Sequence, residues 1–153
     1  MSLALPETLR RWGLELPPIP KPVGVYQPVV RAGGFVFLSG QISRDSKGKV
    51  LAGKVGSELT VEEGKQAARW AALQAVSLID SEVGPDRLEQ IVRMAGFVQS
   101  APDFIGQSDV MNAASELLIE LFGEKGRHVR TSVGVPSLPL NAAVEIELTL
   151  KVQ

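Results

Sequence analysis

VRTSVGVPSLPLNAAVEIELTLKV, residues 129–152, contains two segments in which side chains of different character alternate. In 143–152, one set of side chains is apolar and the intervening set is polar, beginning with Glu145 and Glu147. Because successive side chains of a strand point to opposite faces of a sheet, one face of this strand is core and the other is polar. The polar face is either exposed to solvent or lines a cavity or assembly channel, and alternation alone leaves both possibilities open.

The rest of the chain alternates strand and helix signals. Apolar runs at 25–30 and 35–38 flank a glycine-containing turn, which is typical of a hairpin, and 39–42 continues the second strand. Thr60 and Glu63 form a capping box that starts a helix, which Gly84 and Pro85 end. Segment 91–99 has strand character, and a second helix ends at Gly123. The helices carry apolar stripes at helical spacing: Ala68, Ala72, Ala75, Val76 and Ile79 in the first, Val110, Ala114, Leu117, Leu118 and Leu121 in the second.

The order β-β-α-β-α-β-β predicts an α+β sandwich, with two helices on one face of a mixed sheet. Residues 23–153 form the predicted domain. Residues 1–22 are interpreted as an N-terminal arm, whose prolines favour an extended chain over 16–22. The second sheet face needs a cover, which another subunit can supply.

Composition excludes several classes of function. The 153 residues hold 16 basic and 17 acidic side chains, so the net charge of −1 does not favour a nucleic-acid partner. There is no cysteine, and His128 is the only histidine, so a typical zinc site is not expected. No P-loop, dinucleotide fingerprint or serine-hydrolase elbow occurs, and no cofactor is predicted. Without a membrane span or signal peptide, the expected location is cytoplasmic.

Arg130 is the first candidate functional residue. In strand 129–135 it shares a face with Ser132 and Gly134, whose small side chains leave space around its guanidinium. A planar guanidinium in such a position suits bidentate capture of a carboxylate. The alternative is a salt bridge within the chain or at an interface, and spacing alone favours that alternative.

Glu145 is the second candidate. The connection between the last two strands is short enough for antiparallel pairing, which would place Arg130 and Glu145 near one cleft. A carboxylate there can orient water or transfer a proton. The alternative is the polar face of an ordinary strand.

Three further polar residues are weaker candidates. His128 lies on the same strand face as Arg130 if the strand extends that far, although a lone histidine beside a strand end is more often a solvated side chain than a base. Tyr26 and Asn112 offer hydrogen bonds to a ligand, but each also has a structural explanation.

Several segments together resemble the Rid (reactive intermediate deaminase), or YjgF-like, family. The strongest is the C-terminal set formed by 130–135, Leu138-Pro139 and 143–147. Segments 24–28 and 38–42, with Asn112, also match the family's motifs. The resemblance covers residues 23–152.

The resemblance implies a chorismate-mutase-like fold and a homotrimer with ligand clefts between subunits. In members that hydrolyse enamines and imines, an arginine matching Arg130 binds the substrate carboxylate, and a glutamate matching Glu145 assists attack by water. Tyr26, Ser39, Gly40 and Asn112 would shape the pocket, with Ser132 beside the arginine.

Three functions follow from these residues and the resemblance. The first is cofactor-free deamination of 2-enamino and 2-imino acids to 2-keto acids and ammonia. The second is a module that binds small carboxylates, such as keto acids, without turnover. The third is the endoribonuclease (L-PSP) or translation-inhibitor role under which some members are known.

Ser132 stands where many deaminases have cysteine, and the proline-rich arm with 53–56 resembles a longer branch of the family.

Overall fold

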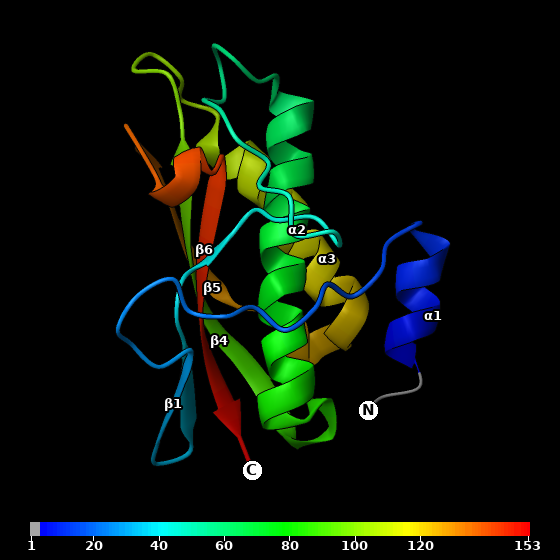
Figure 1. Ribbon diagram of the computed structural model, residues 1–153. Helices are drawn as coiled ribbons and strands as arrows, with labels where there is room; N and C mark the ends of the chain where they lie inside the picture. Colours follow the sequence, from blue (N-terminus) through cyan, green and yellow to red (C-terminus); the bar gives the residue numbers. More distant parts are fainter. Residues whose placement is uncertain (1–3) are drawn as a thin grey trace.

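A mixed sheet with two long helices on one face forms the framework of the computed structural model, which describes residues 4–153 (Figure 1). The strand order is β1-β2-β6-β4-β5, and β3 pairs with β6. The predicted α+β class is therefore confirmed. The strands are β1 (Val29–Ala32), β2 (Phe35–Leu38), β3 (Gln41–Ile42), β4 (Leu88–Gln99), β5 (Val129–Val135) and β6 (Val144–Val152), and the helices are α1 (Ala4–Arg11), α2 (Val61–Leu78) and α3 (Gln107–Phe122).

Strand β6 lies in the middle of the sheet, where it pairs with β2, β3 and β4. Its apolar side chains pack under the helices and are at most 8% exposed. Glu145, Glu147 and Thr149 alternate with them and face away from the helices. The predicted division of this strand into a core face and a second face is confirmed.

The predicted pairing of the last two strands is wrong. β5 runs parallel to β4, with Met94 opposite Arg130, and β4 separates β5 from β6. The reason is the α3 crossover, because a strand that follows a helix packed on the sheet returns parallel to the strand before that helix. The segment after β5 then crosses the end of β4, where the side-chain amide of Gln99 accepts from the Leu138 N–H (2.8 Å) and donates to Asn141 Oδ1 (2.8 Å).

The first hairpin also differs from the prediction. β1 begins at Val29 and not at Val25, since Pro28 has no N–H to donate to a neighbouring strand. The stretch after β2 does not continue that strand: the chain breaks at Ser39 and Gly40 and resumes as β3 against β6.

Helix α2 begins as predicted. Thr60 Oγ1 accepts from the Glu63 N–H (3.2 Å), and Glu63 Oε2 accepts from the Thr60 N–H (2.8 Å). Its last turn widens over Ile79–Val83, and the helical path ends at Gly84, whose φ of 84° is in the left-handed region. Fully buried alanines, among them Ala68 and Ala72, let α2 lie close against the sheet and α3.

The N-terminal segment packs on the helical layer. α1 lies against α3, with Leu9 and Leu14 buried and Arg11 paired with Glu120 at 3.3 Å (Figure 1). The following residues run without helix or strand, as predicted for 16–22, and Ser77 Oγ donates to the Pro17 carbonyl at 2.7 Å.

No helix or strand of the described residues covers the second sheet face. Beside the polar side chains of β6 it presents Phe35, Phe37 and Val133, which remain 41, 46 and 41% exposed. Such a concentration of large apolar side chains on one sheet face is typical of an interaction surface.

Removal of the cap should measurably weaken the fold. Thr60→Ala leaves the Glu63 N–H without its acceptor, so the free energy of unfolding should fall by about 1 kcal/mol. Thr60→Ser keeps the oxygen and should remain within about 0.5 kcal/mol of wild type. Urea denaturation measures both changes, and equal stability of the two variants would contradict the capping role.

Candidate functional site

Arg130 extends from β5 toward one face of α3. Its Nη1 donates to Ser115 Oγ at 2.9 Å, and its Nη2 donates to Ser108 Oγ at 2.8 Å and to Asn112 Oδ1 at 3.0 Å. Ser108, Asn112 and Ser115 are spaced at i, i+4 and i+7, so they share a face of the helix. These bonds hold the guanidinium between α3 and β5, the edge strand of the sheet.

No acidic side chain neutralises Arg130 within residues 4–153. Its hydrogen-bond partners are neutral, and none of the ion pairs in this part of the chain includes it. The intramolecular salt bridge considered from the sequence is therefore not formed among these described residues. Burial lowers the pKa of Arg130, but a guanidinium still keeps its charge at neutral pH. The result is a positioned cation available to an anion.

Two further predicted residues lie beside Arg130. Ser132, two residues along β5, has its Oγ buried without a hydrogen-bond partner among the described residues. His128, two residues before Arg130, is bonded to Ser115 Oγ (2.9 Å) and to the Gly126 carbonyl (2.7 Å). It is therefore part of the same polar cluster and not the solvated side chain considered as its alternative.

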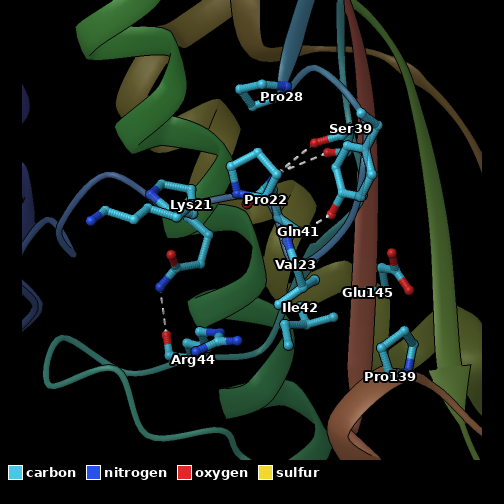
Figure 2. Close-up of a pocket in the computed structure, with 14 residues that line it drawn as sticks. Lys21, Pro22, Val23, Pro28, Ser39, Gln41, Ile42, Arg44, Pro139 and Glu145 are labelled. Carbon is cyan, nitrogen blue, oxygen red and sulfur yellow. Dashed lines mark hydrogen bonds between the residues drawn. The ribbon is translucent and has the colours of Figure 1, made fainter.

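The remaining predicted residues line a second location, shown in Figure 2. Tyr26, Ser39, Gly40 and Glu145 border one pocket with a volume of about 70 Å³, and the same four also border a wider groove beside it. Pro22 and Val23 of the N-terminal segment lie across the pocket from Glu145 (Figure 2).

The Glu145 side chain approaches the backbone closely at Gly40. A Cβ at this position would overlap Glu145 Oε1 and lie 3.0 Å from Glu145 Cδ. The bare backbone therefore lets the carboxylate of β6 lie against the break between β2 and β3.

The Glu145 carboxylate is half-buried and accepts no hydrogen bond from any residue of the described chain. Burial raises the pKa of Glu145, and the negative charge of nearby Glu147 raises it further. A raised pKa brings this carboxyl closer to neutral pH, which favours proton transfer.

Within one chain, Arg130 and Glu145 lie on opposite faces of the sheet. Glu145 is opposite Phe97 on β4, which in turn is opposite the exposed Val133, whereas Arg130 is opposite the fully buried Met94. The prediction that both side chains approach one cleft of a single chain is therefore wrong. The prediction assumed that β5 and β6 are neighbours. β4 lies between them instead, and its register with both strands places Arg130 and Glu145 on opposite faces.

Sequence reasoning missed the partners of Arg130. Ser108 and Ser115 stand four residues before and three residues after Asn112, and this helical spacing would have revealed the polar stripe. The contribution of 20–23 to the Glu145 pocket has no local signal, because it depends on how the N-terminal segment runs across the fold.

The described residues give no indication of a metal centre. Among 4–153, no three His, Asp or Glu side chains are grouped so as to hold a metal ion.

In the same range, no helix combines the length and the apolar character needed to cross a bilayer.

Comparison with known proteins identifies the family. Residues 7–151 match the family described as YjgF/chorismate mutase-like, "putative endoribonuclease". The chain belongs to the YjgF family. Relatives of the chain include Protein TCP17 of Trypanosoma cruzi, which is 43% identical over 141 residues, 91% of this chain and 88% of that protein. The resemblance seen in the sequence is confirmed.

Two other proteins are similar to this chain over nearly their whole length. The 2-iminobutanoate/2-iminopropanoate deaminase of Dermatophagoides farinae is 30% identical over 135 residues, 88% of this chain and 91% of that protein. A crystal structure from Shewanella oneidensis, described as "a putative endoribonuclease", superposes with a TM-score of 0.89 at 34% identity and covers 95% of this chain and 97% of that one.

Because the pKa of Glu145 is raised, replacing its carboxylate with a neutral amide should stabilise the fold by an amount that depends on pH. Above that pKa the half-buried carboxylate is charged and penalises the fold, so Glu145→Gln should raise the melting temperature at pH about 8. The gain should shrink as the pH falls through the pKa and disappear at pH about 4, where wild-type Glu145 is protonated. Thermal melts across this range test it, and a gain independent of pH would contradict the assignment.

Proposed function

We propose that the protein hydrolyses 2-imino and 2-enamino acids to 2-keto acids and ammonia, without a cofactor, in clefts between copies of the chain. The observation that carries this proposal is the Arg130 guanidinium, fixed by three neutral side chains of α3 with its charge left for a ligand. The deaminase name of the Dermatophagoides relative supports the same reaction.

Arg130 binds the substrate carboxylate in this proposal. Its described hydrogen bonds are made by Nη1 and Nη2, so Nε–H and a second Nη1 hydrogen remain as donors. Charge-assisted hydrogen bonds from a guanidinium to a carboxylate are roughly twice as strong as neutral ones. The bonds to Ser115 and Asn112 hold the donors in place, which reduces the entropy lost on binding.

Glu145 positions and deprotonates the attacking water. The water oxygen bonds to the imine carbon, the proton passes through Glu145 to the nitrogen, and the carbinolamine then loses ammonia to leave a ketone. An enamine first takes a proton at its carbon, which protonated Glu145 can supply. The raised pKa of Glu145 suits both steps, because it makes the protonated form of this carboxyl easier to reach than that of an ordinary glutamate.

The two halves of the site come together only between chains in this proposal. Arg130 and Glu145 face opposite sides of one sheet, so the Arg130 side of one copy must meet the Glu145 side of another. Such a contact is head-to-tail and is closed by a ring, for which we propose a homotrimer. The exposed Phe35, Phe37 and Val133 supply the apolar area that an assembly would bury.

The Arg130→Lys variant tests the carboxylate anchor. Lysine keeps the charge but loses the planar fork, so binding of pyruvate or 2-oxobutyrate should weaken by about 1–3 kcal/mol. Hydrolysis of imino acids generated in place by an amino-acid oxidase should fall in parallel. Isothermal titration calorimetry and keto acid release measure these effects.

Arg127→Lys is the matched control for this experiment. Arg127 is a nearby arginine paired with Glu124 at 3.0 Å, and its replacement should change neither binding nor turnover. Unchanged keto acid affinity in a normally folded Arg130→Lys protein would exclude the anchor role.

A further inference from the structure

A chain of hydrogen bonds continues from Arg130 into the protein. Arg130 Nη1 donates to Ser115 Oγ (2.9 Å), Ser115 Oγ is 2.9 Å from His128 Nε2, and His128 Nδ1 is 2.7 Å from the Gly126 carbonyl. A single hydroxyl group therefore links the only histidine of the protein to the candidate anion site.

The chemistry of the partners fixes the direction of each bond. The Gly126 carbonyl can only accept, so the proton of neutral His128 is on Nδ1, and Nε2 is left as an acceptor. The Ser115 hydroxyl then donates to Nε2 and directs its lone pairs at Arg130. In this arrangement, every donor in the series of hydrogen bonds from Arg130 to Gly126 meets an acceptor.

Few charged groups approach His128. On α3, Asp109 pairs with Lys65 at 3.4 Å and Glu120 pairs with Arg11 at 3.3 Å, both away from β5. The other charged residues near His128 in the fold are exposed. Glu116 follows Ser115 on α3, and the turn after α3 contains Lys125 and Glu124, which pairs with Arg127. Arg93 of β4 donates to Thr131 on the other sheet face. Burial lowers the pKa of His128, the bond to Gly126 opposes this, and the charge of Arg130 lowers it further.

We propose that Ser115 and His128 position the Arg130 guanidinium, and that binding of a carboxylate to Arg130 is coupled to uptake of a proton by His128. This inference rests on the proposed carboxylate anchor and adds two positioning residues and a proton to it. Ligand affinity should consequently depend on a group that is not in contact with the ligand.

The sign of the coupling follows from the charges. A carboxylate on Arg130 cancels part of the repulsion that opposes protonation of His128, so its pKa rises when the ligand is bound. Linkage is reciprocal, so the ligand binds more tightly to the protein with protonated His128. Protonated Nε2 also turns from acceptor to donor, which releases the Ser115 hydroxyl hydrogen to rotate toward a bound oxygen.

NMR can follow this coupling directly, because one histidine gives one imidazole signal. Titration of wild-type protein should show an Nδ1–H tautomer without ligand, and an upward shift of the His128 pKa with saturating pyruvate. The dissociation constant of pyruvate should fall about fivefold from pH about 8 to pH about 5. An identical His128 pKa with and without bound pyruvate would overturn the coupling.

Variants separate the positioning role from other titrating groups such as Glu145. His128→Gln keeps an acceptor for Ser115 without a titratable proton, so it should bind like wild type at pH about 8 and lose the fivefold gain. Ser115→Ala should weaken pyruvate binding at both pH values. Glu116→Gln, which removes a charge beside Ser115 but outside the chain of bonds, should retain the wild-type profile.

The two levels of the hypothesis fail differently. If wild-type protein binds no keto acid at any pH, the carboxylate anchor itself is wrong, and this inference falls with it. If wild-type protein binds pyruvate while His128→Gln shows an unaltered pH profile, the anchor stands and only the role of His128 is refuted.

Discussion

The alternation of side chains along β6 is the constraint on which the rest of the structure depends. Its apolar residues must face α2 and α3 to form the core, so Glu145 has to lie on the opposite face, against Gly40. Arg130 is bound to α3 and consequently lies on the helix side of the same sheet. One chain therefore holds a cation and a carboxylate that it does not bring together, and this separation is the reason for proposing a site shared by two copies.

Each half of the candidate site keeps a charge that the described chain does not neutralise. The partners of Arg130 are hydroxyl, carbonyl and amide groups, which orient the guanidinium without cancelling it. Glu145 is half-buried, and Glu147 repels its charged form. Groups held in this way interact more strongly with an incoming ligand than paired groups would, at some expense in stability. The same reasoning extends to His128, whose protonation Arg130 opposes until an anion is bound.

The sequence predicts what depends on neighbouring residues and fails where distant segments meet. The capping box of Thr60 and Glu63 and the two faces of β6 are local patterns, and both are as predicted. The insertion of β4 beside β6 is a choice of strand order, which no periodicity encodes. For the site, the family resemblance singled out Arg130 and Glu145 as candidates, but their placement on opposite faces required the strand order. Ser115 could have been predicted, because it lies three residues after Asn112 and therefore on the same face of the helix.

Complementation between inactive variants tests the central claim that the site is shared. Arg130→Ala and Glu145→Gln chains should each lack imino acid hydrolysis alone. After unfolding and refolding as an equal mixture, about one site in four should combine an intact Arg130 from one copy with an intact Glu145 from another, so about a quarter of wild-type activity should return. Mass spectrometry of the intact assemblies verifies mixing. Activity that stays at the level of the separate variants, in assemblies shown to be mixed, would contradict a site built from two chains.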